Sequence, residues 1–140
     1  MNDLLALYQE VILDHSRHPR HFGELYGATH QAEGNNPLCG DDITLYLTLS
    51  DQAIQAIQFT GNGCAICMAS ASLLTEHVSG KTILQVQDSF AAFMHLAERG
   101  AESSDVSLGK LTVFASVHRF PLRVKCATLP WHALKAALIK

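Results

Sequence analysis

The chain has 140 residues, of which 48% are hydrophobic and 16% are charged, with a net charge of −3 when the histidines are neutral. This composition fits one domain spanning residues 1–140 and excludes a disordered chain. The acidic balance argues against a nucleic-acid partner, and no apolar run approaches the roughly 20 residues that span a membrane. Residues 1–15 contain Asp3 and Glu10 but no Lys or Arg, so we expect no export signal and a cytoplasmic protein.

The N-terminal segment is predicted to form a helix that is capped by Asp3 and runs to about Ser16. Residues 15–23 contain Pro19 and are predicted to form a loop, and a short strand is predicted over residues 28–32. Apolar side chains at helical spacing predict one buried stripe on the first helix: Leu4, Leu7, Tyr8, Val11 and Ile12.

The next segment has the pattern of a β-hairpin. Residues 34–41 are rich in turn-forming types. Apolar and polar side chains alternate over residues 43–50, which predicts a half-buried strand. Asp51 and Gln52 then form the expected turn into a partner strand over residues 53–59.

Helices are predicted for much of the remaining chain. Residues 61–63 should break the strand, and residues 64–80 and 82–99 are expected to form two helices, the second closed by Gly100. Residues 101–108 are polar and are expected to form a loop.

The C-terminal pattern is less regular. Residues 109–117 are ambiguous between helix and strand. Pro121 suits the first turn of a helix that carries Cys126, and Pro130 should end or kink that helix before another over residues 131–139. A small sheet early in the chain and helices late in it predict an α+β domain.

Three cysteines and one aspartate are candidates for a shared metal site. Cys39 and Asp41 flank a glycine in a turn, and Cys64 and Cys126 lie in turns or near predicted helix N-termini, whose partial positive charge stabilises thiolates. In a reducing cytosol such residues act as metal ligands or reactive thiols rather than disulfides. Three thiolates and one carboxylate suit tetrahedral zinc or iron. The spacing alone equally permits buried cysteines that act as small hydrophobes.

A C-x-x-C pair and a row of histidines are weaker candidates for redox or metal chemistry than these three cysteines and the aspartate. Cys64 and Cys67 form a C-x-x-C pair, but a hairpin rather than a βαβ unit precedes them, which disfavours a thioredoxin-type role. Helix geometry carries Cys67 toward the core instead. Three histidines are spaced by three residues, but a proline interrupts any helix that would align them, so a solvated loop is expected: His15, His18 and His21.

Four segments, taken together and in this order, resemble the NifU-like, U-type iron–sulfur cluster assembly proteins. The resemblance implies an α+β (SufE/NifU-like) fold, with a three-stranded antiparallel sheet packed with about five or six helices. It also implies that Cys39, Asp41, Cys64 and Cys126 gather as metal ligands at one exposed site. The matching segments are Tyr8–Gly23, Asn36–Asp41, Gly61–Ile66 with Ala69–Ser72, and Arg123–Leu129 with Trp131.

Three features place the resemblance with the SufU-type branch rather than the IscU-type branch. Lys125 stands where IscU-type scaffolds have a histidine, and no Leu-Pro-Pro-Val-Lys (LPPVK) chaperone motif precedes Cys126. The stretch between the second and third cysteines is also longer. The branch implies a zinc-dependent acceptor of persulfide sulfur from a SufS-type, pyridoxal-phosphate (PLP) cysteine desulfurase, which passes sulfur to downstream SUF assembly components without independent turnover.

Two other functions stay open. One is a scaffold on which a [2Fe–2S] cluster is built with iron in place of zinc (Zn²⁺). The other is a structural zinc domain that acts only as an interaction module.

The resemblance also suggests a role for each ligand. Cys39 is the expected sulfur acceptor, because its glycine-flanked loop can move, while Cys64 and Cys126 hold the metal. Asp41 supplies a harder, more labile oxygen ligand. The resemblance suggests a ligand exchange in which a partner side chain takes one coordination position, so that the acceptor thiolate is released.

Four nearby residues complete the prediction. Arg123 and Lys125 are expected to offset the negative charge of the site beside Cys126. Cys67 stands where the family is expected to have serine, and His21 where it tends to have asparagine.

Overall fold

The computed structural model describes residues 3–102 and 106–139, and the side chains of that part from residue 6 onward. A three-stranded antiparallel sheet in the order β1-β2-β3 combines with five helices, counting one 3₁₀-helix, so the predicted α+β class is confirmed. The elements are α1 (Asp3–Arg17), β1 (His30–Asn36), β2 (Asp41–Ser50), β3 (Ala53–Asn62), α2 (Ala65–Val78), α3 (Ile83–Arg99), η1 (Gly109–Val117) and α4 (Pro121–Leu138).

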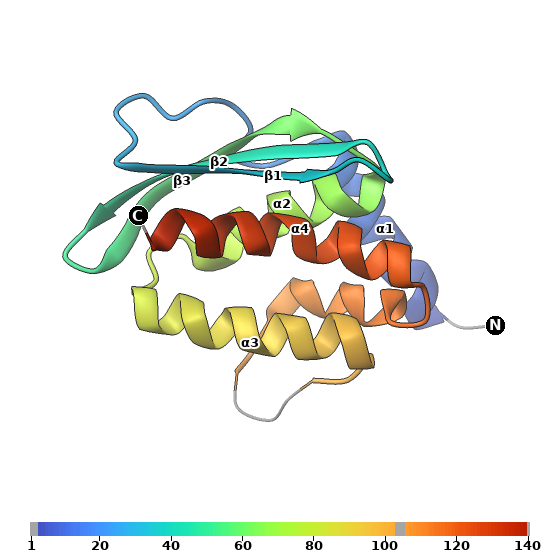
Figure 1. Ribbon diagram of the computed structural model, residues 1–140. Coiled ribbons are helices and arrows are strands. Elements are labelled where there is room, and N and C mark those ends of the chain that lie inside the picture. The colour runs from blue at the N-terminus through green and yellow to red at the C-terminus, as the bar shows by residue number, and fades with distance from the viewer. Residues whose placement is uncertain (1–2, 103–105, 140) are drawn as a thin grey trace.

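The helices cover one face of the sheet (Figure 1). Helix α4 packs against β1 and β2, and α2 packs against β3. Helix α3 and η1 form a further layer that contacts α4. This layering brings residues from the end of the chain next to the first hairpin.

The central hairpin follows the predicted alternation. Ile43, Leu45 and Leu47 of β2 are fully buried, while the residues between them are partly exposed. Asp51 and Gln52 both have positive φ values, 53° and 65°, as two-residue hairpin turns require. The predicted strand and turn are therefore confirmed.

The two middle helices begin and end close to their predicted bounds. Cys64 is the N-cap of α2, and Thr82 caps α3 in a capping box with Gln85. Gly100 closes α3 in the left-handed conformation at φ 75°. Capping residues and glycines therefore located these boundaries well.

The first hairpin and the third strand extend beyond their predicted limits. Strand β1 runs over residues 30–36 because its last residues pair with the start of β2 as far as Asn36 opposite Asp41. Strand β3 continues through Asn62 because Gly61, at φ 143°, stays in the ladder opposite Ile43. The predicted strand break at residues 61–63 is therefore placed too early.

The first helix differs from its predicted stripe. Leu7 is 53% exposed, so its predicted burial is wrong, whereas Ile12 and His15 are buried. Helix α1 packs against α2 and η1, and the His15 ring lies 2.7 Å from the Ser72 hydroxyl of α2. The predicted loop therefore begins only after Arg17. The predicted cap at Asp3 involves a side chain outside the described part.

Helix α4 continues through Pro130, so the predicted break into two helices is wrong. Proline lacks an amide hydrogen, and the carbonyl four residues earlier therefore loses its helical donor. That carbonyl belongs to Cys126. Packing of α4 on the sheet and on α2 keeps one helix despite this loss. The ambiguous segment before it is the 3₁₀-helix η1.

Aromatic side chains fill the core between α3, η1 and α4. Trp131 is fully buried and stacks on Phe93, with ring centroids 4.9 Å apart. Phe114 meets Phe93 edge-to-face, and His77 lies beside Trp131 with ring centroids 6.4 Å apart. The His77 ring also lies 3.0 Å from the Ser89 hydroxyl, which ties α2 to α3.

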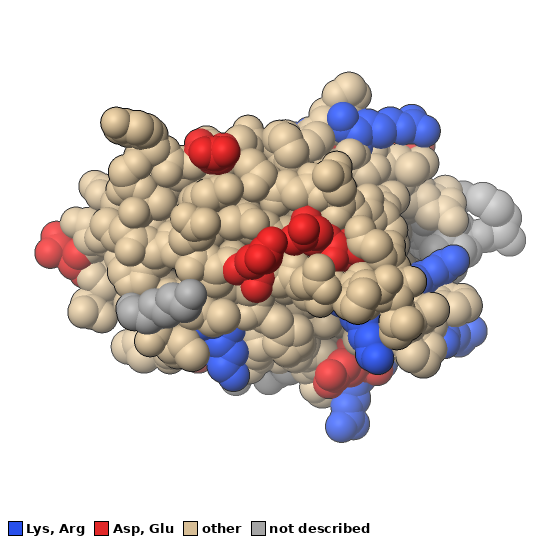
Figure 2. Space-filling view, turned by 45° about the horizontal axis from the view of Figure 1, so that its top comes forward, with Lys and Arg blue, Asp and Glu red and all other residues tan. Residues whose placement is uncertain are grey.

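The surface seen in Figure 2 carries few charged side chains. Acidic side chains lie together near its middle, and most Lys and Arg side chains lie toward its right side. Asp42 hydrogen-bonds to Glu33 and thereby raises the pKa of that carboxyl group. Within the described part of the chain, the helices are all too short or too polar to cross a membrane.

Protonation of His77 is expected to destabilise the fold at mildly acidic pH. Burial, with help from the positive charge of Lys81, lowers the pKa of His77 from 6.5 to about 4. The unfolded chain therefore binds more protons than the folded chain between these values, and stability falls as pH falls from about 6.5 toward 4. Urea unfolding midpoints should decrease over this range and decrease less in His77→Gln. Equal slopes in both proteins would contradict this role.

Candidate metal centre

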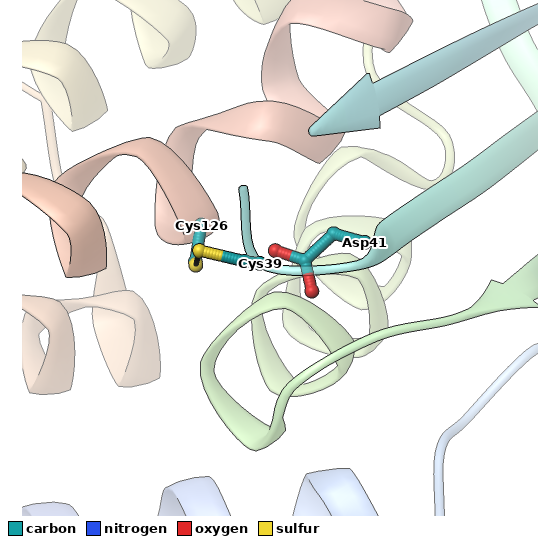
Figure 3. A group of neighbouring side chains, drawn as sticks. All are labelled: Cys39, Asp41 and Cys126. Atoms are coloured by element: carbon teal, nitrogen blue, oxygen red, sulfur yellow. Dashed lines mark hydrogen bonds between the residues drawn. The ribbon is translucent and has the colours of Figure 1, made fainter. Parts of the chain in front are cut away.

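The predicted ligands come from three parts of the fold that meet at one end of the sheet. Cys39 lies in the turn between β1 and β2, and Asp41 is the first residue of β2. Cys64 caps α2, and Cys126 lies in the second turn of α4. Figure 3 shows the side chains of Cys39, Asp41 and Cys126 pointing toward one another.

Three of these side chains form a compact group. The Cys39 and Cys126 sulfur atoms are 3.2 Å apart, although the residues are 87 positions apart in sequence (Figure 3). One ligand atom from each of Cys39, Asp41 and Cys126 lies within 4.8 Å of the other two. The hairpin turn and α4 thus create a cluster that spacing alone left open.

The fourth predicted ligand, Cys64, lies beside Asp41 and outside this compact group. Its sulfur is 3.8 Å from Asp41 Oδ2 and accepts the backbone N–H of Cys67 at 3.4 Å. Helix N-terminal amides favour a negatively charged sulfur. Cys64 is therefore near enough to the group to serve as the remaining ligand after a side-chain movement.

Asp41 is a buried residue whose carboxylate lies next to the thiols. Its side chain accepts the backbone N–H of Cys64 at 2.8 Å, and the residue is only 1% exposed. Gly63 permits this approach, because a Cβ there would lie 2.8 Å from Asp41 Oδ1. Among the described residues, no Lys, Arg or His forms an ion pair with Asp41. A bound cation would offset the cost of burying this charge.

The turn that carries Cys39 is held at its base and open at its tip. Asn36 accepts the backbone N–H of Leu38 through its side chain and that of Cys39 through its carbonyl. Leu38 is 75% exposed, and Gly40 has a positive φ of 69°. The buried Asn36 Nδ2 has no hydrogen-bond partner in the described part of the chain.

The electrostatics of the group favour a bound cation. Burial, followed by the hydrogen bonds that the Cys126 thiol makes to Cys39, Asp41 and Cys64, raises the pKa of this thiol. Burial likewise raises the pKa of Cys67, which lies in the core as predicted. The Cys126 thiol therefore favours its protonated form until a metal displaces the proton. Sulfur and carboxylate donors of this kind fit zinc or iron.

The charged residues near Cys126 face solvent. The Arg123 guanidinium lies 4.4 Å above the centre of the Phe120 ring and makes a cation–π contact there. Lys125 is exposed. Their predicted compensation of the site's charge remains a prediction.

The three histidines spaced by three residues lie outside the compact ligand group. His18 and His21 are exposed, as predicted, whereas His15 is buried in α1, so its predicted solvation is wrong. The shaping roles of Asn36 and Gly63 could not be predicted from the sequence, because their residue types indicated only a turn.

Comparison with known proteins gives one matching family and several relatives. The family model described as NifU-like N terminal domain matches residues 7–139. A Streptococcus pyogenes serotype M1 protein named iron-sulfur cluster assembly scaffold protein IscU is 40% identical, over 99% of this chain and 86% of its own length. A Bacillus subtilis protein named zinc-dependent sulfurtransferase SufU is 36% identical, over 99% of this chain and 93% of its own length.

A solved structure shares this architecture. It is described as a putative iron-sulfur cluster assembly scaffold protein for the SUF system from Fervidobacterium islandicum AW-1. That chain is 33% identical, with a TM-score of 0.87, and the match covers 95% of this chain and 97% of the other.

Proposed function

The chain belongs to the NifU-like N-terminal domain family of iron–sulfur cluster assembly proteins, and we propose that it is a zinc-dependent sulfur acceptor for a SufS-type cysteine desulfurase. We propose further that residues 1–140 act as one such domain. The position of Cys39 is the main support for this proposal. It lies in an open, glycine-containing turn directly beside a second thiol and a buried carboxylate.

Cys39, Asp41, Cys64 and Cys126 would hold the zinc, which would keep their sulfurs as thiolates at neutral pH. The open turn lets Cys39 leave the group and meet a persulfide on the desulfurase. Its sulfur then attacks the outer persulfide sulfur, so that a new persulfide forms on Cys39 and the desulfurase cysteine leaves as a thiolate. Asp41 and the two helical cysteines stay in place behind it.

A [2Fe–2S] scaffold is the second candidate. The same donors suit an iron–sulfur cluster, and the streptococcal relative carries a scaffold name at a similar identity. Lys125 favours sulfur acceptance instead, because its ammonium group cannot ligate iron as an imidazole beside Cys126 would. In the proposed role, the acquired sulfur passes to downstream SUF components.

Zinc removal is expected to abolish stimulation of the desulfurase. Alanine release from cysteine would be measured with the cognate desulfurase, first with the zinc-loaded chain and then with the chain stripped by a chelator. Stimulation by the zinc form alone supports the proposed role, because only the ordered thiolate group can accept sulfur.

Three other outcomes contradict this role. Equal rates with both forms would make zinc incidental. Cluster-type visible absorbance after anaerobic reconstitution, without stimulation, would favour the scaffold. Unfolding on zinc loss, with no effect of either form on the desulfurase, would indicate a structural module.

A further inference from the structure

The contact between Cys39 and Cys126 joins an accessible thiol to a fixed one. Cys39 is half-buried in the open turn, whereas Cys126 is only 4% exposed. The carbonyl of the neighbouring Ala127 accepts the Ser70 hydroxyl, which anchors this part of α4 to α2. Cys39 can therefore receive sulfur from outside, while Cys126 lies behind it, 3.2 Å from sulfur to sulfur.

Among the described residues, no hydrogen bond joins either of the other two thiols to Cys39, although Cys64 also hydrogen-bonds with Cys126. The Cys64 sulfur lies against Asp41 and accepts the Cys67 N–H. Cys67 itself is fully buried in the core. Cys126 is thus the thiol positioned to react with Cys39.

We propose that Cys126 resolves a persulfide on Cys39 by attacking the inner sulfur, which releases sulfide and leaves a Cys39–Cys126 disulfide. This inference rests on the proposed function, since it takes Cys39 as the sulfur acceptor. It adds a second outcome for the acquired sulfur: free sulfide when no downstream acceptor is present.

The atoms and electrons of this step balance. A bond forms between the Cys126 and Cys39 sulfurs, and the bond between the Cys39 sulfur and the outer sulfur breaks. The outer sulfur leaves as HS⁻ when the Cys126 thiolate attacks, and it takes a proton from solvent to give H₂S. It gains two electrons, which the two cysteine sulfurs supply as they become a disulfide. A dithiol reductant is then needed to restore the thiols.

Contact makes this exchange intramolecular. A thiol held against its target reacts far faster than one that must diffuse to it, and losing that placement costs about 100-fold in rate. The same contact explains why a persulfide on Cys39 would be short-lived unless an acceptor removes its outer sulfur first.

The test follows sulfide and disulfide formation in a single turnover. The reduced full-length chain would be loaded by the desulfurase and cysteine, separated from both, and kept without reductant. Wild type should release sulfide and yield a disulfide-linked peptide pair containing residues 39 and 126. Cys126→Ser also lacks a proposed zinc ligand, so its Cys39 would be loaded with inorganic polysulfide alongside a wild-type sample treated in the same way. It should retain the sulfur on Cys39 and release sulfide about 100-fold more slowly than wild type.

Two variants distinguish the contacting thiol from other effects. Cys64→Ser also removes a predicted ligand but keeps both contacting thiols, so after loading with inorganic polysulfide it should release sulfide and form the Cys39–Cys126 disulfide. Cys67→Ala should behave as wild type. Equal slowing in Cys64→Ser and Cys126→Ser would overturn the inference, as would a stable persulfide in wild type or its transfer intact to Cys126.

The experiment distinguishes a failure of the proposed acceptor role from a failure of the resolving step. If the desulfurase adds no sulfur to the chain, the acceptor role is wrong. Loading Cys39 with inorganic polysulfide then tests the resolving step by the same peptide pair. Sulfide release with the Cys39–Cys126 disulfide supports the inference, and a persulfide that persists on Cys39 overturns it.

Discussion

Replacing Cys39 with serine is expected to abolish sulfur acceptance while the chain stays folded. A serine hydroxyl remains protonated at neutral pH and is a poor nucleophile toward a persulfide, so stimulated sulfur transfer should fall by about 1,000-fold or more, the scale on which loss of a nucleophile acts. The half-buried turn position should tolerate the change. Mass spectrometry after incubation with desulfurase and cysteine would locate any added sulfur atom.

Cys67→Ala is the matched control for that experiment. It also removes one thiol, but this thiol is fully buried and its backbone N–H to Cys64 is retained. Sulfur acceptance should survive in this variant. Undiminished sulfur loading of Cys39→Ser, with the sulfur on Cys64 or Cys126, would refute the assignment of the acceptor.

Gly61→Ala is expected to destabilise the fold by about 3–5 kcal/mol, through backbone strain and overpacking together. Gly61 has a φ of 143°, and a Cβ there would lie 2.0 Å from the carbonyl oxygen of Asp42. That oxygen belongs to the backbone, so the hairpin must open to make room. Asp41, the preceding residue, would move with it, and zinc affinity should fall as well. Urea unfolding and zinc titration would measure the two effects.

Gly80→Ala separates the clash from the strain. Gly80 also has a positive φ, 82°, but no atom lies within 4 Å of its added Cβ. Its cost should be that of a left-handed alanine, about 1–2 kcal/mol, with zinc affinity unchanged. Similar losses in the two variants would mean that the crowding at Gly61 relaxes at little cost.

Local signals predicted the elements that local chemistry determines. The alternation of β2, the cap at Thr82 and the closing Gly100 each depend on near neighbours, and the structure confirms them. Pro130 is different, because the packing of α4 against the sheet outweighs one missing hydrogen bond. The end of β1 likewise depends on its pairing with β2 rather than on its turn-forming composition.

In the candidate site, too, features that depend on near neighbours could be predicted and features that depend on tertiary packing could not. The setting of Cys39 and Asp41 in a tight turn was readable from the chain itself. The approach of Cys126 to Cys39 depends on α4 packing against β1, which spacing cannot reveal. The resemblance supplied that grouping. The position of Cys64 beside Asp41, outside the compact group, needed side-chain geometry.

Because α4 continues through Pro130, the position of Cys126 depends on how this helix packs and not on a helical hydrogen bond to its own carbonyl. The missing donor leaves the backbone carbonyl of Cys126 without its helical partner, so the contacts of α4 with α2 and the sheet, including the Ser70 hydroxyl on Ala127, hold this turn in place instead. The spacing between the two contacting sulfurs can then be tuned from a residue that never touches them. An engineer who wants a tighter or looser thiol pair would begin at position 130, and would leave every ligand unchanged.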